Sequence, residues 1–380
     1  MRLSVLKVGL FLLAIACDAP TTPVPMGPHQ LFERPQALIF LNDTLIVSES
    51  GYGLEGWGTG HISSIDPSTA RIENRWQTSQ LNPQTMRSLG DTIAIVNTGA
   101  FDLSDFDVPR AATEGGVDLI SATSINSPQA IIENWVLGLP MAPDAPQSPM
   151  ELKVTDDHIL ITSGLSTSVW WGHRHESPPH FEVIVTNPGT DIGLGSAAVW
   201  QDRFIIVDFN SDTITWVEPT GEVSNCLVHI GSDEIAIEGA QSPVVNGNTL
   251  YVLMALSGRV VGIDLVQLTD ECDPTTRVVI PSTGQVPNQM QLHNGRLYIV
   301  HSADNNIVSY DPSDGSEIRR WVLPVGSNPW HIAFDDRGQY MAVTEWGANA
   351  VSIINLANHD IRRVTTGTSA QGSSESASSP

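Results

Sequence analysis

Short runs in which apolar residues alternate with polar ones fill most of this chain. Runs of four to eight residues rich in Val, Ile and Thr are bounded by Gly, Pro, Asn and Asp, and helical periodicity is scarce. A period of two predicts β-strands that are buried on one face. The pattern repeats: the segments that start at residues 286 and 328 each contain four such runs joined by short turns. A period near forty residues with four strands is typical of one propeller blade.

Extending this unit toward the N-terminus gives seven repeats. They start near residues 34, 82, 148, 194, 239, 286 and 328. Asn246-Gly247 and Asn294-Gly295 supply the positive backbone angles that tight hairpins need. The sequence therefore predicts an all-β, seven-bladed β-propeller with four-stranded blades over residues 34–367. It leaves open whether the ring closes by borrowing an N-terminal strand or with four strands from the last repeat.

The segments TLYVLMALSGRVVGID and RLYIVHSADNNIVSYDPSDG resemble the YVTN-type repeats of bacterial seven-bladed propellers, which are relatives of the lactonase-like group. The resemblance covers the last three repeats well and the first three poorly, and the namesake tetrapeptide is altered to YVLM at 251 and YIVH at 298. It implies an exported or surface propeller. It carries little information about chemistry.

The ends of the chain predict export and anchoring. Arg2 and Lys7 flank a short apolar stretch that ends at Cys17, so residues 1–16 are typical of a secretion signal. Ala14, Ala16 and Cys17 resemble a bacterial lipobox, which implies lipidation of Cys17 and a Pro-rich tether over 17–33. The alternative is an ordinary cleaved signal. We expect a lipoprotein of the bacterial cell envelope, periplasmic or at the cell surface, with a disordered tail over 368–380.

The other two cysteines fall at the outer ends of consecutive repeats. Two thiols in an exported chain predict one disulfide between Cys226 and Cys272, the alternative being two free thiols. The formal net charge of −24 disfavours binding to nucleic acid. It also repels anionic lipid headgroups, so we expect membrane attachment through the lipid on Cys17 alone. We expect a monomer.

Three repeats carry long insertions between their second and third strands, whereas the other four have tiny turns. The insertions are SGYGLEGWGTG, AFDLSDFDVPRAATEG and GLSTSVWWGHRHESPPH, in blades 1, 2 and 3. Long loops are usually functional or disordered, and these would emerge side by side on one face. We therefore expect a binding surface for a protein or glycan. The candidate ligand-binding residues are Tyr52, Trp57, Asp102, Asp105, Asp107, Trp170 and Trp171.

Two of these loops also carry candidate metal ligands. His173 and His175 would point to one side of an extended segment and His180 could add a third imidazole, which predicts a Cu or Zn site. The alternative is a solvated His-rich turn. Asp102, Asp105 and Asp107 have carboxylates at a spacing that can bind Ca²⁺, although the EF-hand pattern is absent.

Catalytic signatures are scarce. The chain has no Gly-x-Ser-x-Gly elbow and no phosphate-binding Gly loop. Three hypotheses remain: a lipid-anchored binding scaffold, an envelope metal-binding protein, and a lactonase-like metal-dependent hydrolase with an ion in the central channel. The entries to the innermost strands offer mainly Ala, Ser, Met and Gln, so the hydrolase ranks last. His301, near the expected channel mouth, is the isolated histidine most worth testing.

Overall fold

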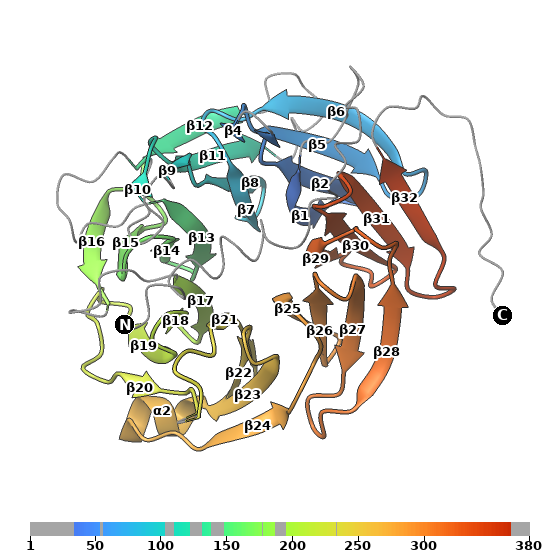
Figure 1. The fold of residues 1–380 in the computed structure, drawn as a ribbon. Coiled ribbons are helices and arrows are strands. Elements are labelled where there is room, and N and C mark those ends of the chain that lie inside the picture. Colours follow the sequence, from blue (N-terminus) through green and yellow to red (C-terminus); the bar gives the residue numbers. More distant parts are fainter. Residues whose placement is uncertain are drawn as a thin grey trace.

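The computed structural model describes residues 34–53, 56–102, 110–121, 131–137, 148–176, 178–186, 195–232 and 234–365. The predicted signal, Cys17, the predicted tether and the predicted tail lie outside these residues. Seven four-stranded antiparallel sheets surround a common centre (Figure 1), which confirms the predicted seven-bladed β-propeller. The first strand of each blade faces the centre and the fourth lies at the rim.

The first strands begin within one residue of the predicted blade starts. They are β1 (Pro35–Leu41), β7 (Pro83–Ser88), β13 (Pro149–Val154), β17 (Gly195–Trp200), β21 (Ala240–Asn246), β25 (Pro287–His293) and β29 (Pro329–Phe334). The second strands are β2 (Thr44–Glu49), β8 (Thr92–Asn97), β14 (His158–Ser163), β18 (Arg203–Asp208), β22 (Thr249–Met254), β26 (Arg296–His301) and β30 (Tyr340–Glu345).

The outer half of each blade completes the sheet. The third strands are β5 (His61–Asp66), β11 (Gly116–Ser121), β15 (Ser168–His173), β19 (Thr213–Val217), β23 (Arg259–Asp264), β27 (Asn306–Tyr310) and β31 (Ala350–Asn355). The fourth strands are β6 (Arg71–Gln77), β12 (Ile131–Val136), β16 (Phe181–Val185), β20 (Val228–His229), β24 (Thr276–Ile280), β28 (Glu317–Val322) and β32 (Ile361–Thr365).

Two faces follow from this topology. The chain enters every first strand on one face, where the turns between second and third strands also lie; we call it the entry face. The turns between first and second strands, and between third and fourth strands, lie on the opposite face. The residue before the first strand often has a left-handed backbone, as at Asn82 (φ 57°) and Asn328 (φ 44°), which suits Asn.

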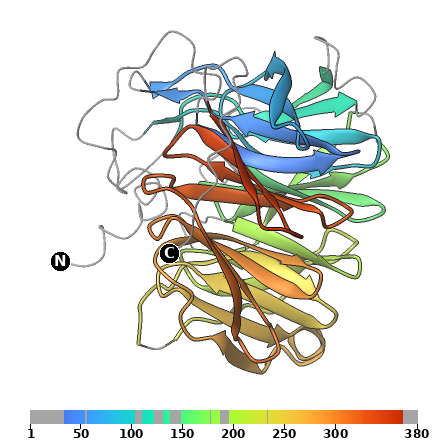
Figure 2. The same cartoon turned by 90° about the vertical axis from the view of Figure 1, so that its right-hand side faces the viewer.

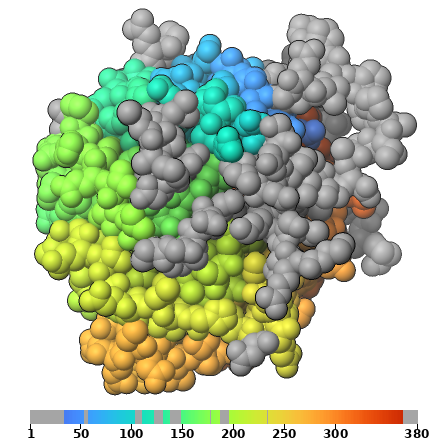
Figure 3. Space-filling view, turned by 60° about the vertical axis from the view of Figure 1, so that its left-hand side comes forward, coloured from blue at the N-terminus to red at the C-terminus, as the bar shows by residue number. Residues whose placement is uncertain are grey.

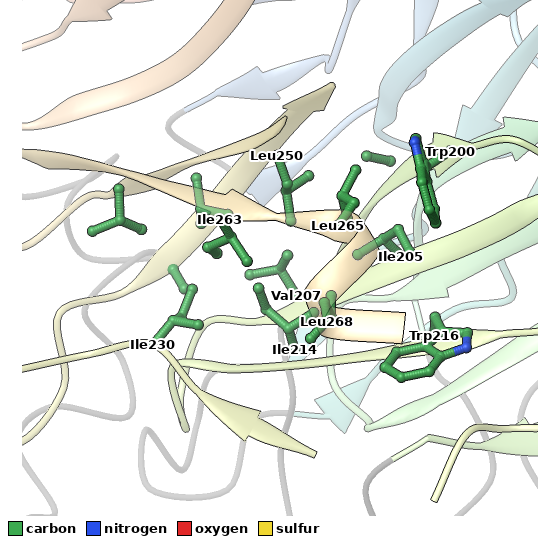
Figure 4. Packing of buried hydrophobic residues seen from close by; sticks show 14 of the residues in the cluster. Trp200, Ile205, Val207, Ile214, Trp216, Ile230, Leu250, Ile263, Leu265 and Leu268 are labelled. Atoms are coloured by element: carbon green, nitrogen blue, oxygen red, sulfur yellow. The ribbon is translucent and has the colours of Figure 1, made fainter. Parts of the chain in front are cut away.

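The core consists of seven apolar clusters, one between each pair of neighbouring blades. Middle strands are buried on both faces because each sheet is covered by two neighbours. Figure 4 shows the cluster between blades 4 and 5, which includes Leu265 and Leu268 of helix α2 (Leu265–Glu271); Leu268 lies beside Val207 and Ile214. Seen from the side in Figure 3, blades 3 to 5 form adjoining bands around the rim.

A disulfide ties blades 4 and 5 together at this place. Cys226 and Cys272 are bonded, with their Cα atoms 5.7 Å apart, which confirms the predicted pair. Cys272 is the C-cap of α2 and has a left-handed backbone (φ 56°). Cys226 precedes β20 and is buried in the cluster. Among the described residues, no helix has the length and apolar character that a membrane span requires.

Side chains also bond every blade to the next near the centre. Each of the seven interfaces has at least one hydrogen bond between a side chain and an innermost backbone group. The pairs are Ser48 with Pro83, Thr85 with Met150, Glu151 with Ala197, Asp212 with Ala240, Gln241 with Pro287, Ser302 with Pro329 and Thr344 with Gln36. These bonds satisfy polar groups in places where water is excluded.

The ring closes between blades 7 and 1 without an exchanged strand. The sheet of blade 7 uses β29 to β32 and that of blade 1 uses β1, β2, β5 and β6. The two blades contact through β1 and β29, and they are neighbours in both views (Figures 1 and 2). An apolar cluster that includes Leu38 and Ala342 fills the seam. The Arg34 amide also donates to the Asn349 side chain (3.0 Å).

The layout predicted for blade 3 is wrong. The insertion GLSTSVWWGHRHESPPH is expected between the second and third strands, which makes the following segment FEVIV the third strand, but FEVIV is the fourth strand, β16. The third strand is Ser168–His173, which pairs with β14 from His158↔His173 to Ile161↔Trp170. The turn between second and third strands is therefore residues 164–167 alone. The long His-rich loop expected on the entry face is a buried strand followed by a turn on the opposite face.

Candidate functional site

The long loops of blades 1 and 2 do lie on the entry face, and each folds into a small hairpin. In blade 1, β3 (Tyr52–Gly53) pairs with β4 (Gly56–Trp57). In blade 2, β9 (Phe101–Asp102) pairs with β10 (Arg110–Ala111). A glycine starts each loop with a positive φ, Gly51 at 69° and Gly99 at 82°. A Cβ atom at either position would collide with a carbonyl oxygen across the loop, so the narrow bases need glycine.

Aromatic rings join these two hairpins. The Tyr52 and Trp57 ring centroids are 4.8 Å apart, and those of Trp57 and Phe101 are 5.9 Å apart. Both pairs are tilted, a favourable arrangement for aromatic contacts. Phe101 is buried, while Tyr52 and Trp57 are half-buried. The loops of neighbouring blades thus form one surface.

The same surface continues onto blade 7. The Arg34 guanidinium lies 4.3 Å from the ring centroid of Trp346, and it donates a hydrogen bond to the Trp346 carbonyl (3.0 Å). Burial lowers the pKa of Arg34, and the nearby Tyr52 opposes this shift. Arg34 thus contacts Trp346 and lies within electrostatic range of Tyr52. We call Trp346, Arg34, Tyr52, Trp57 and Phe101 the aromatic band.

Charged residues border this band at blade 2. Asp102 and Arg110 are opposite each other in the β9–β10 pair, and both are exposed. The other two carboxylates predicted for Ca²⁺ binding, Asp105 and Asp107, lie outside the described residues. Of the seven ligand-binding residues predicted from sequence, Tyr52, Trp57 and Asp102 therefore lie together on the entry face.

Trp170 and Trp171 lie elsewhere, and the exposed loop expected around them does not exist. Both belong to β15 and both side chains are about 5% exposed. Trp170 packs in the cluster between blades 2 and 3, and Trp171 packs in the cluster between blades 3 and 4. Their position is explained by alternation, because successive residues of a strand buried on both faces enter different interfaces.

The three predicted metal-binding histidines lie at the turn between β15 and β16, on the face opposite to the band. His175 Nε2 is 3.5 Å from Asp157 Oδ1, and the His180 amide donates to Glu176 (3.1 Å). His173 lies next to His158 instead, with ring centroids 5.1 Å apart. The described residues contain no group of three or more His, Cys, Asp or Glu side chains arranged to hold a metal ion.

The centre of the ring holds charges of both signs. Lys153 on β13 forms an ion pair with Glu151, and Glu151 also accepts a hydrogen bond from Ala197 (2.9 Å). Burial, followed by the electrostatic effect of Lys153, lowers the pKa of His331 on β29 to about 3. Lys153 of blade 3 thus lies within electrostatic range of His331 of blade 7. An ammonium group in this position repels a cation, unlike the set of carboxylates that a divalent ion prefers.

Buried ion pairs stabilise blades 1 and 7, and sequence reasoning missed them. Arg75 binds the fully buried Glu49 (2.8 Å) and Arg363 binds the fully buried Glu345 (2.6 Å). The sequence pattern that could have revealed these ion pairs is a glutamate at the last position of the second strand, together with an arginine in the fourth strand of the same blade. Ser352 also donates to Glu345, so this carboxylate is fully engaged. We interpret these groups as structural.

The chain matches no protein-family model and no curated protein sequence. Solved structures do resemble it. A virginiamycin B lyase from Staphylococcus aureus has a TM-score of 0.61 at 11% identity, covering 84% of this chain and 94% of that one. A protein from Lactobacillus plantarum has a TM-score of 0.60 at 12% identity, covering 86% and 96%. A computationally designed protein has a TM-score of 0.54 at 10% identity, covering 86% and 98%. At these identities the similarity shows the fold alone.

Proposed function

We propose that this propeller is a binding scaffold that recognises a protein partner through the aromatic band on the entry face. The observation that carries the proposal is the continuity of the band across three blades. Trp, Tyr and Arg are the residue types that most often dominate the energetics of protein interfaces. Here they are half-buried, which fixes their geometry while leaving surface for a partner. This retains the expected scaffold function but moves its surface from blades 1–3 to blades 7, 1 and 2.

Contacts within the band hold its residues in place, so a partner could bind without first ordering this surface. Each hairpin base is narrow, and Arg34 is fixed by its contact with Trp346 and by bonds of its own backbone. A surface that is already ordered avoids part of the entropic cost of association. The net charge of −24 would attract a partner with a basic surface and speed its association.

A glycan is the second ligand class that aromatic side chains favour. Stacking on a sugar needs an exposed ring face, however, and the half-buried Trp57 ring already contacts two other rings, those of Tyr52 and Phe101. The geometry therefore supports a protein more than a sugar. The proposal retains the exported, lipid-anchored location. The disulfide supports export alone, because such bonds persist in oxidising compartments.

Site-specific photocrosslinking in the native host tests this function. A photoreactive amino acid would replace Arg110, an exposed residue beside the band, and in a control Asp314, an exposed residue on the opposite face of blade 6. We expect a discrete protein adduct from position 110 that is absent from position 314. Excess unlabelled wild-type protein should suppress the adduct, and a Tyr52→Ala/Trp57→Ala protein should not.

Two results would contradict the proposal. Equal adducts from both positions would indicate non-specific contact. A folded protein that gives no adduct at position 110, but binds an oligosaccharide in a glycan panel in a Trp57-dependent manner, would replace the protein partner with a glycan.

A further inference from the structure

The face opposite to the aromatic band carries a pair of histidines on neighbouring strands. His158 is the first residue of β14 and His173 is the last residue of β15, and the two are direct partners in the antiparallel register. Side chains of directly opposed residues stand on the same face of the sheet, with Cβ atoms about 4.5–5.5 Å apart. The topology therefore brings together two imidazoles that are 15 positions apart in the sequence.

The distance between these rings suits a shared metal ion. The ring centroids are 5.1 Å apart and the ring planes are inclined by 46°. With metal–nitrogen bonds of about 2.0 Å, two imidazoles that bind one ion at angles of about 90–110° have centroids about 4.5–5.2 Å apart. The observed spacing of 5.1 Å falls within this range.

The surroundings hold the pair in place and favour a cation. The His158 ring stacks on Trp171 (4.9 Å between centroids, 21° between planes), and the His173 ring meets the same indole edge-on (5.1 Å). Trp171 is buried and is itself packed by Gly221 of blade 4. The carboxylates of Asp157 and Asp202 lie close enough to act electrostatically on His158.

We propose that His158 and His173 form a two-imidazole binding site for a divalent late transition-metal ion, with Cu²⁺ the tightest-binding case. Neutral imidazole suits Cu, Ni and Zn, and affinity across such ions is greatest for Cu²⁺. The site uses two protein ligands and leaves the remaining coordination positions to water or to a ligand from outside. It is independent of the aromatic band, and it differs from the turn site predicted from sequence because His158 takes the place of His175 and His180.

Copper titration of the tag-free protein at pH 7.5 tests the site. Tryptophan fluorescence is the readout, because bound Cu²⁺ would lie close to Trp171 and quench its emission. Calorimetry gives the stoichiometry. We expect saturable quenching with one ion per chain. His158→Gln and His173→Gln should each weaken binding by more than about 100-fold, beyond the roughly 10–100-fold loss that follows removal of a residue that only supports a ligand.

His175→Gln and His180→Gln are the matched controls, since they lie on the same turn and should bind Cu²⁺ as the wild type does. His173 is exposed, so its variant keeps the test valid even if His158→Gln impairs folding. Copper electron paramagnetic resonance should show two imidazole nitrogens in the wild type and one in His173→Gln. Unchanged binding by His173→Gln, equal losses in the control variants, or no saturable binding would each overturn the proposal.

Discussion

His301 ends the second strand of blade 6 and is completely buried. Its Nδ1 bonds to the Asn306 side chain (3.0 Å), and its Nε2 has no hydrogen-bond partner within the described structure. Burial lowers the pKa of His301 from 6.5 to about 4, with the Asn306 bond opposing the shift. A proton on Nε2 would place a charge without a hydrogen-bond partner at a fully buried position, so the imidazole is neutral in the folded state.

This burial predicts a pH-dependent stability. The folded-state pKa lies below the unfolded one, so the contribution of His301 is fully present above pH 6.5 and is lost as the pH falls toward 4. Within that window, one proton taken up on unfolding lowers the free energy of unfolding by about 1.4 kcal/mol per pH unit. Urea denaturation at several pH values should show a shallower fall for His301→Gln than for the wild type. The exposed His180→Gln should retain the wild-type slope, and equal slopes for all three proteins would contradict the prediction.

Val286 has a strained backbone conformation. It precedes the first strand of blade 6 with φ 53°, where the equivalent residues of blades 2 and 7 are Asn82 and Asn328. A β-branched side chain is strained in the left-handed region by about 1–2 kcal/mol, whereas Asn tolerates it. We expect Val286→Asn to raise the free energy of unfolding by about 1 kcal/mol and Asn328→Val to lower it by a similar amount. Changes of the same sign in chemical denaturation would show that another effect dominates.

Among the individual elements, strands with a clear hydrophobic pattern could be predicted from the sequence. Strand β15 could not. Ser168–His173 reads SVWWGH, and its two tryptophans enter opposite interfaces, so that apolar residues adjoin instead of alternating. The strand was therefore interpreted as part of a loop. Tyr52 and Trp57 were predicted as binding residues because their loop is long. Trp346 lies in a four-residue turn and Arg34 directly precedes β1, so loop length could not indicate either residue. Their role depends on which blades are neighbours in the closed ring.

The disulfide also acts between elements, joining α2 of blade 5 to the approach to β20 of blade 4. Its cysteines are 46 positions apart in the sequence. In the chain-entropy model, closing a loop of this length stabilises the folded state by about 4 kcal/mol. Cys226→Ala/Cys272→Ala should therefore unfold at a lower denaturant concentration than the oxidised wild type, and a reductant should shift the wild type alone. A midpoint unchanged by reduction, with loss of the disulfide verified by mass spectrometry, would contradict this account.

In the whole molecule, seven similar blades form an approximately uniform ring, but its long loops between second and third strands lie in the neighbouring blades 1 and 2. The β3–β4 and β9–β10 hairpins stand on the entry face of neighbouring blades, and closure of the ring brings Trp346 of blade 7 to the same place. A propeller fold supports many functions, so the function must be argued from such a site. The opposite face bears the His158–His173 pair, well separated in topology from the band. One chain could thus present a partner-binding surface and a metal site independently.

The proposed function requires the aromatic band to provide most of the energy of binding. The affinity of the crosslinked partner for alanine variants, measured by calorimetry, tests this requirement. We predict that Trp57→Ala and Trp346→Ala each weaken binding by about tenfold or more, as expected of interface hot spots. Arg320→Ala, an exposed substitution on the rim of blade 6, should leave the affinity unchanged. Full affinity in the folded Trp57→Ala and Trp346→Ala proteins would contradict the account.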